Sequence, residues 1–187
     1  MRGGTMEFQD LDGKRIKLIK LDESGLEDMW EYSKNPLLYR FFEFLPQQTI
    51  EETKEYLDKL MKRGAAGNAH YWFVSLRENG KIIGSFGVHD IDWRKKDAEI
   101  SYSISPDYWG QRYFEESLRT VLWYLFQEQR FHRVHATTRF DNMPSIKGLE
   151  SVGFQIEGRL REFYYSHDSK RYDAVVLGIL RGEFNND

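Results

Sequence analysis

The stretch SISPDYWGQRYFEESLRTVLWYLF, from Ser103 to Phe126, decides the fold prediction. It begins inside residues 98–105 (AEISYSIS), an alternating segment that predicts a strand. A loop with Gly110 follows, and a helix is then predicted to about residue 129, with apolar residues at the helical spacing Leu118, Val121, Leu122 and Leu125. Backbone N–H groups at a helix start lack partners, and the helix dipole favours an anion there. The stretch therefore predicts a strand–loop–helix unit that can hold an anionic group.

The rest of the chain alternates strands and helices around this unit. The sequence predicts further strands at residues 15–21, 71–76, 81–88, 133–138, 154–165 and 172–180, and helices at residues 26–33, 49 to about 62, and 143–151. Asn79-Gly80 marks a hairpin, because this dipeptide accepts positive φ. The strands at 98–105 and 133–138 flank the long helix, so they should be parallel. These elements predict a mixed α/β fold, with a sheet of about seven strands flanked by about four helices.

Length and composition restrict the class of protein. A chain of 187 residues suits one domain, which we place at residues 11–187 behind a flexible tail at residues 1–10. The net charge is −3 with both signs interspersed, so we expect no nucleic-acid partner. No apolar run is long enough for a membrane and no signal peptide opens the chain, so we expect a cytoplasmic protein. The lack of cysteine excludes disulfides, cysteine–zinc sites and a thiol nucleophile.

A second informative segment, FDNMPSIKGLESVGF, runs from Phe140 to Phe154 after the strand that follows the long helix. Together the two segments resemble the GCN5-related N-acetyltransferases (GNAT), and within them the RimJ/RimL-type branch. In that branch a strand with an acidic residue leads into a Pro-x-Tyr-Trp-Gly-x-Gly-Tyr loop, here PDYWGQRY, and an Asn-x-x-Ser run, here Asn142 to Ser145, leads to Gly-Phe. The resemblance runs from about residue 11 to residue 184 and is strongest from Glu99 onward.

The resemblance implies acetyl-coenzyme A as co-substrate and an amine as acceptor. The loop at the helix start would bind the pyrophosphate through backbone N–H groups rather than serve as a plain helix entry; its residues are Trp109, Gly110, Gln111, Arg112, Tyr113 and Phe114. Ile104 would offer a backbone N–H to the thioester carbonyl. Asn142 would contact the pantetheine arm, and it also fits a helix cap. The amine would attack directly, without an acyl-enzyme.

Two side chains are candidate catalytic groups. Glu99 is the candidate general base, because an ammonium must lose a proton before it attacks a thioester. Ser145 is the candidate acid for the leaving thiolate, since Leu149 stands where the family often has a tyrosine. Each has a plainer alternative: Glu99 as a strand carboxylate paired with Arg94 or Lys96, and Ser145 as a first-turn serine facing water.

Two residues depart from the family pattern. Arg112 replaces the second glycine of the loop, and Phe114 replaces a small residue. A side chain at position 112 limits the backbone conformations open to the loop, although an arginine could compensate by pairing with a phosphate. The alternative is a non-catalytic module that binds acyl-coenzyme A.

Several properties stay open at this level. The acceptor could be the α-amino group of a protein N-terminus or a small amine such as an amino sugar, a polyamine or an aminoglycoside, and a homodimer is compatible with the sequence. The aromatic run of residues 38–46 falls where the family covers its acceptor pocket, although such runs are more often core. His132 and His135 are three apart at a strand start and so point to different faces, and we expect no metal.

Overall fold

A single eight-stranded sheet forms the centre of the computed structural model, which describes residues 9–67 and 69–185. The strand order is β1-β2-β3-β4-β5-β6-β8-β7, and only β5 and β6 pair in parallel. The strands are β1 (Leu11–Asp12), β2 (Ile16–Lys20), β3 (Ala69–Leu76), β4 (Ile82–Asp92), β5 (Asp97–Ile104), β6 (Arg133–Arg139), β7 (Gln155–Tyr165) and β8 (Arg171–Leu180). The parallel pair confirms the crossover expected from the long helix between them.

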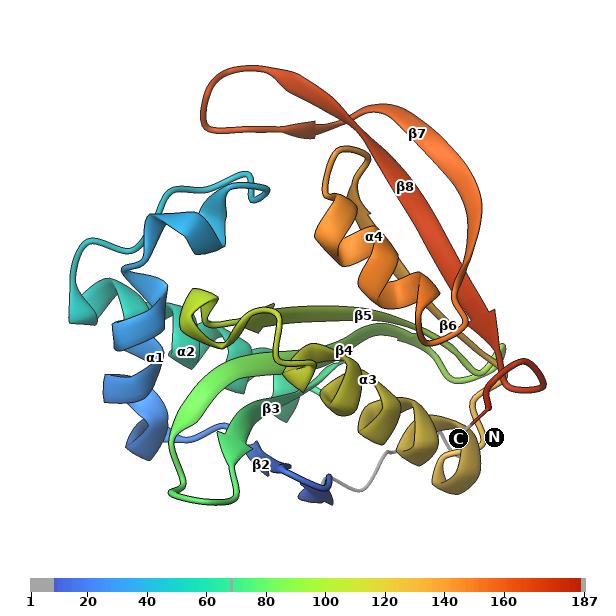
Figure 1. Cartoon of the computed structure of the whole chain (residues 1–187), viewed down its shortest axis with the longest axis horizontal. Coiled ribbons are helices and arrows are strands. Elements are labelled where there is room, and N and C mark those ends of the chain that lie inside the picture. The colour runs from blue at the N-terminus through green and yellow to red at the C-terminus, as the bar shows by residue number, and fades with distance from the viewer. Residues whose placement is uncertain (1–8, 68, 186–187) are drawn as a thin grey trace.

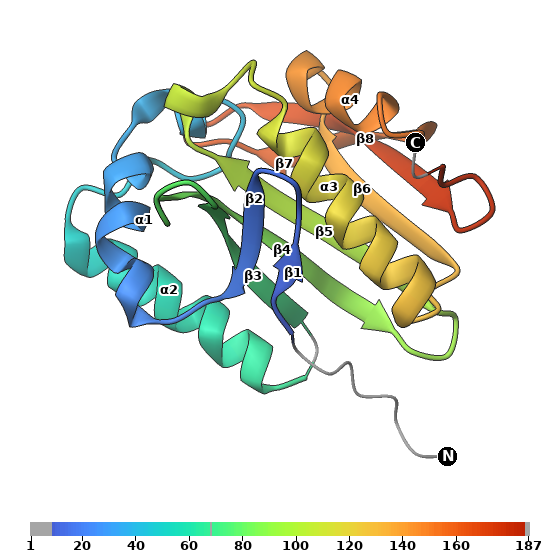
Figure 2. The ribbon, with the colours of Figure 1, turned by 60° about the horizontal axis from the view of Figure 1, so that its bottom comes forward.

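The helices lie on both faces of this sheet (Figures 1 and 2). They are α1 (Leu26–Ser33), α2 (Ile50–Ala65), α3 (Tyr113–Trp123), which continues as a π-helical turn over Tyr124–Glu128, and α4 (Met143–Glu150). The main core holds the buried residues of α3 and α4 against one face, for example Leu118 and Leu149. A smaller core packs α1 and α2 against the other face around Phe73. The sheet therefore has an α3/α4 face and an α1/α2 face.

Local sequence signals explain several element boundaries. Gly80 adopts φ +76 in the hairpin between β3 and β4, as its dipeptide predicts. The side chain of Thr49 accepts a hydrogen bond from the Glu52 N–H at 3.2 Å and caps α2. The Glu52 carboxylate bonds to the N–H of Gln48, one residue before the position expected in a capping box.

The fold agrees with the sequence prediction in its order of elements and differs at some edges. The two-residue strand β1 adds an eighth strand, and β4 runs to Asp92 rather than to Val88. Residues 1–8 of the predicted tail lie outside the described residues. The Gln9 carbonyl accepts a hydrogen bond from the indole of Trp72, and the Asp10 carboxylate accepts one from the Lys20 N–H. No helix among the described residues is long and apolar enough to cross a membrane.

Candidate functional site

The sheet opens between its two central strands. β5 and β6 pair only at Asp97 with Arg133, Ala98 with Val134, and Glu99 with His135. Beyond Glu99 the two strands separate, and Figure 1 shows β6 continuing behind α4 while β5 runs on toward α1. The resulting split leaves the part of β5 beyond Glu99 without a paired strand on the β6 side.

The backbone of β5 turns hydrogen-bonding groups into this split. The Ser105 N–H bonds to the Ile83 carbonyl at 2.7 Å, so the paired residues Gly84 and Ile104 are of the non-hydrogen-bonded type. The N–H of Ile104 therefore points away from β4 and toward the side where β6 has diverged. The carbonyl of Ile104 points the same way and accepts the indole N–H of Trp109 at 2.7 Å. Ile104 thus turns a backbone N–H toward the split, and its role toward a thioester carbonyl stays a prediction.

The start of α3 leaves several backbone N–H groups without a partner inside the helix. Its cap residue Arg112 makes no side-chain cap bond, and the first intrahelical bond runs from the Glu116 N–H to the Arg112 carbonyl. The N–H groups of residues 112–115 consequently have no partner within the helix. Gly110 has φ +74, with no atom within 4 Å of where a Cβ would stand. The loop leaves its backbone open to a ligand.

Arg112 also occupies a left-handed conformation, with φ 66 and ψ 16. A glycine takes this conformation without strain, and this is a physical reason for the glycine that the family pattern has at this position. The Arg112 side chain is 78% exposed, and its Nε lies 3.1 Å from Glu115 Oε2. Within the part of the chain that the structure describes, the guanidinium is held by this one surface ion pair and can change partner.

The other loop side chains mainly support the backbone. The Gln111 side-chain amide donates to the Asp107 carbonyl at 3.3 Å, and the Tyr113 ring lies under the guanidinium of Arg15 at 4.4 Å. Phe114 turns inward, with its ring centroid 4.3 Å from that of Tyr102. A Cβ on Gly148 of α4 would come within 2.7 Å of Phe114, so the missing side chain at 148 makes room for the phenylalanine.

Asn142 and Ser145 lie together at the start of α4, across the split from β5. Asn142 caps the helix by accepting the Ser145 N–H at 3.4 Å, and its amide donates to Thr138 Oγ1 at 3.1 Å. The cap expected for Asn142 is confirmed, and the amide retains one hydrogen and one lone pair for a ligand. Ser145 does not face water alone, because its hydroxyl lies 2.7 Å from the hydroxyl of Tyr102.

Glu99 lies at the point where the strands separate, on the α1/α2 face. It is the cross-strand neighbour of His89 on β4 and of His135 on β6. His135 Nε2 is 3.9 Å from Glu99 Oε2, and both side chains are about four-fifths buried, at 21% and 22% exposure. The partners considered from sequence, Arg94 and Lys96, are not those of Glu99 among the described residues; Lys96 donates instead to the Gln129 carbonyl.

One group of side chains beside Glu99 has the spacing of metal ligands. Single ligand atoms of His89, Asp90 and Glu99 lie within 4.8 Å of one another. Asp90 is 69% exposed, and its carboxylate already bonds His89 Nδ1 at 2.9 Å. We assign no ion to this group, and the expected absence of a metal stays a prediction.

The segment before α2 that holds the aromatic run contacts β6 and the end of β7. Arg139 places its guanidinium 3.5 Å from the ring centroid of Tyr172 and 5.5 Å from that of Phe41. The Tyr165 N–H donates a hydrogen bond to Glu43 Oε1 at 2.8 Å, which links the segment that contains Phe41 and Glu43 to the end of β7. Part of the aromatic run thus packs against the β7–β8 hairpin, as both the core and the pocket interpretations allowed.

Tyr164 of β7 lies close to the candidate base. Its hydroxyl donates to the Thr137 carbonyl at 3.0 Å. Burial, followed by the negative charges of Glu99 and Glu43, raises the pKa of Tyr164 to about 12. A cation entering here would meet Glu99 and Glu43 around a neutral phenol.

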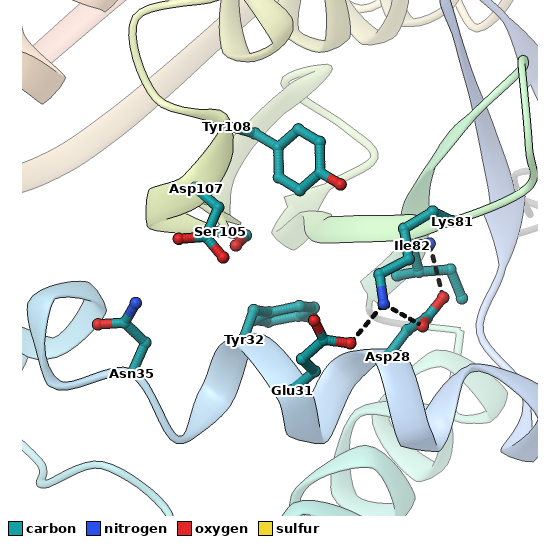
Figure 3. Close-up of a pocket in the computed structure, with 9 residues that line it drawn as sticks. All are labelled: Asp28, Glu31, Tyr32, Asn35, Lys81, Ile82, Ser105, Asp107 and Tyr108. Atoms are coloured by element: carbon teal, nitrogen blue, oxygen red, sulfur yellow. Dashed lines mark hydrogen bonds and ion pairs between the residues drawn. The ribbon is translucent and has the colours of Figure 1, made fainter.

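A separate small pocket of about 70 Å³ lies between α1 and the 3₁₀ turn Pro106–Tyr108 (Figure 3). Its lining includes an ion-pair cluster in which Lys81 Nζ lies 2.8 Å from Asp28 Oδ1 and also bonds Glu31. These hydrogen bonds raise the pKa of Lys81, so the cluster stays charged. None of the predicted site residues lines this pocket, and the cluster ties α1 to the start of β4.

The structure adds residues that the sequence did not single out. These residues come from three different strands: His89 and Tyr164 lie near Glu99, and Tyr102 bonds Ser145. The partners are up to 65 positions apart along the chain. No local spacing signals such contacts. Side chains alternate between the two faces of the sheet along β5, so Glu99 and Tyr102 point to opposite faces. This alternation is the one sequence signal that could have indicated that Tyr102 faces α4.

Comparison with known proteins places this arrangement in a family. The GNAT acetyltransferase domain model matches residues 15–155. An N-acetyltransferase of Bacillus licheniformis, p20, itself uncharacterised, is 25% identical over 177 residues, which cover 95% of this chain and 99% of that protein. A GNAT-family acetyltransferase of Bacillus anthracis shares the fold with a TM-score of 0.82, at 23% identity over 94% of this chain and all of the other.

A further solved structure agrees with the RimJ/RimL-type resemblance at the level of the fold. It is RimL, a ribosomal L7/L12 α-N-protein acetyltransferase in complex with coenzyme A, with a TM-score of 0.83 and 19% identity over 92% of this chain and 98% of the other. The split sheet, the open helix start and the family match agree with one another, and the chain belongs to the GNAT family of N-acetyltransferases.

Proposed function

We propose that this enzyme transfers an acetyl group from acetyl-coenzyme A to a primary amine that approaches Glu99 from the α1/α2 face of the sheet. The observation that carries the proposal is the position of Glu99 at the end of the β5–β6 pairing, on the face opposite α3 and α4. Donor and acceptor can therefore meet through the split from two sides. Such positioning of two reactants accounts for much of the rate of a bimolecular reaction.

The residues present fit the coenzyme. The unpartnered N–H groups of residues 112–115 and the open backbone at Gly110 suit its pyrophosphate. The remaining side-chain amide hydrogen of Asn142 suits a polar atom of its pantetheine arm. Bound in this way, the coenzyme supplies an activated acetyl thioester.

The chain's own groups then divide the chemical work. Glu99 accepts the proton that the ammonium must lose, and the neutral amine attacks the thioester carbonyl. The N–H of Ile104 stabilises the negative charge that develops on the carbonyl oxygen. Ser145 donates a hydrogen bond to the leaving sulfur from the α4 side of the split, and in this role it stabilises the thiolate without protonating it. Glu99, Asp90 and Glu43 give the acceptor side a negative character that attracts a cationic amine.

An amine panel tests the proposal. Free coenzyme A thiol is measured with amino sugars, polyamines, aminoglycosides and N-terminal peptides as acceptors, and the acetylated product is identified by mass. Peptides belong in the panel because one relative, 27% identical over 114 residues, is named a putative ribosomal N-acetyltransferase. We expect amine-dependent thiol release with at least one class. Coenzyme binding without release for every amine would favour the non-catalytic alternative.

A further inference from the structure

We propose that Tyr102 is a positioning residue for the departure of the thiol, acting by holding the Ser145 hydroxyl as a donor to the leaving sulfur. This inference rests on the proposed function. It adds a residue to the reaction, since Tyr102 comes from β5 while Ser145 comes from α4. The bond between their hydroxyls, 2.7 Å long, spans the split in the sheet.

The ring of Tyr102 is fixed by its packing. It stacks on Phe86 with ring centroids 5.7 Å apart and contacts Phe114 at 4.3 Å. Within residues 9–67 and 69–185, the recorded hydrogen-bond partner of its hydroxyl is Ser145. A rotation of the phenol away from Ser145 would have to disturb both neighbouring rings, so the hydroxyl is preorganised.

The direction of this hydrogen bond decides what Ser145 can do. A serine hydroxyl has one hydrogen, and if it donated that hydrogen to Tyr102, none would remain for a sulfur atom. A phenol is the more acidic of the two hydroxyls and therefore the better donor. With Tyr102 donating to Ser145 Oγ, the Ser145 hydrogen is left to point into the split, and the chain of two hydrogen bonds polarises the serine O–H.

The phenol is also kept in its donating form. Burial is the main cause that raises the pKa of Tyr102, and the bond to Ser145 only partly offsets it. When the C–S bond breaks, its electron pair goes to sulfur, and the pair of hydroxyls stabilises the thiolate by hydrogen bonding. Neither hydroxyl gives up its proton. The nitrogen that has attacked the carbonyl releases its remaining extra proton to water as the amide forms, and the thiolate takes a proton from water, so the step balances.

The pKa of the coenzyme A thiol, measured when bound to the protein, tests this directly and needs no acceptor amine. It is read from the ultraviolet absorbance of the thiolate during a pH titration. In the wild type we expect a pKa below that of free coenzyme A. Tyr102→Phe, which keeps the ring, should raise the bound thiol pKa by roughly one unit, the equivalent of one hydrogen bond to the anion. Tyr124→Phe, which removes another buried phenol at the far end of α3, is the matched control and should leave it unchanged.

A double-mutant cycle on turnover provides the second measurement. Tyr102→Phe should lower kcat by about 10- to 100-fold with little change in the KM for acetyl-coenzyme A. In a Ser145→Ala background the same change should have almost no further effect, because Tyr102 acts through Ser145. Additive losses would indicate a separate structural role and overturn the inference.

The outcomes separate the two proposals. If the wild type does not bind coenzyme A, the proposed function fails. If it binds coenzyme A and the thiol pKa is the same in wild type and Tyr102→Phe, only the Tyr102 inference fails. Should the phenylalanine variant not fold, 3-fluorotyrosine at position 102 replaces it. Its more acidic phenol should lower the bound thiol pKa further, and an unchanged value would contradict the inference.

Discussion

Arg112 gives the sharpest test of how the α3 loop holds the coenzyme. The variant Arg112→Gly changes backbone strain and charge at the same position, and the structure allows the two effects to be separated. Relief of the left-handed conformation stabilises the fold by about 1–2 kcal/mol. The greater freedom of glycine in the unfolded chain opposes this by about 0.4–1 kcal/mol. Loss of the exposed pair with Glu115 removes at most about 1 kcal/mol.

These terms partly cancel, so the melting temperature of Arg112→Gly should stay within about 6 °C of the wild type. The affinity for coenzyme A should nevertheless fall, because the guanidinium is expected to leave Glu115 and bond to a phosphate. A lost charge-assisted hydrogen bond of about 1–3 kcal/mol raises Kd by about 5- to 150-fold.

Isothermal calorimetry at low and high salt is the appropriate assay. Arg112→Ala keeps the strained backbone and Arg112→Lys keeps the charge, so they bracket the two effects. We expect weak binding in the alanine and glycine variants, partial affinity in the lysine variant, and a smaller difference from wild type at high salt. Equal or tighter binding by Arg112→Gly would refute the reasoning and show that the arginine is only a tolerated surface residue.

Two further predictions concern the supports of the site. The Glu116 carboxylate accepts hydrogen bonds from the backbone N–H groups of Arg15 and Ile16 and from the Arg15 side chain. Burial alone would raise the pKa of Glu116, but these hydrogen bonds lower it overall. Because the folded pKa is depressed, this stabilisation is present above the unfolded pKa of about 4.3 and is lost as the pH falls through the folded pKa. Glu116→Gln should therefore lower the free energy of unfolding by about 1–3 kcal/mol at neutral pH, measured by denaturant unfolding, and its difference from wild type should shrink in acid. A difference that stays constant down to acid pH would contradict this. Gly148→Ala should destabilise the protein by about 1–3 kcal/mol, because its Cβ would meet Phe114 at 2.7 Å. The double variant with Phe114→Leu should recover most of this loss in thermal unfolding, whereas additive losses would place the strain elsewhere.

The order of the fold could be predicted from sequence because its signals are local. Alternation over residues 98–105, the helical spacing after Gly110 and the Asn79-Gly80 turn each depend on residues a few positions apart. The strand β1 is only two residues long and carries no periodicity, so the sequence does not predict it. The π-helical turn after Trp123 spans too few residues for the spacing of apolar residues to predict it.

The site could be predicted only in part. The family resemblance indicated Glu99, Asn142 and Ser145. The structure has Glu99 where β5 and β6 stop pairing and the other two residues at the start of α4, and their roles stay predictions. The resemblance could not show that Tyr102 bonds Ser145, because the strand–helix contact depends on where β5 and β6 cease to pair. It also could not show that a histidine, rather than Arg94 or Lys96, lies beside Glu99, since cross-strand neighbours follow from register.

The most direct test of the account is the pH dependence of turnover in Glu99→Gln at saturating acetyl-coenzyme A and with an acceptor found by the amine panel. Glutamine keeps the shape of the side chain but accepts no proton. The account predicts turnover lower by roughly 10²–10⁴-fold at neutral pH, unchanged affinity for acetyl-coenzyme A, and partial recovery at high pH, where more of the amine arrives neutral. Near-normal turnover at neutral pH in a stably folded Glu99→Gln protein would contradict it.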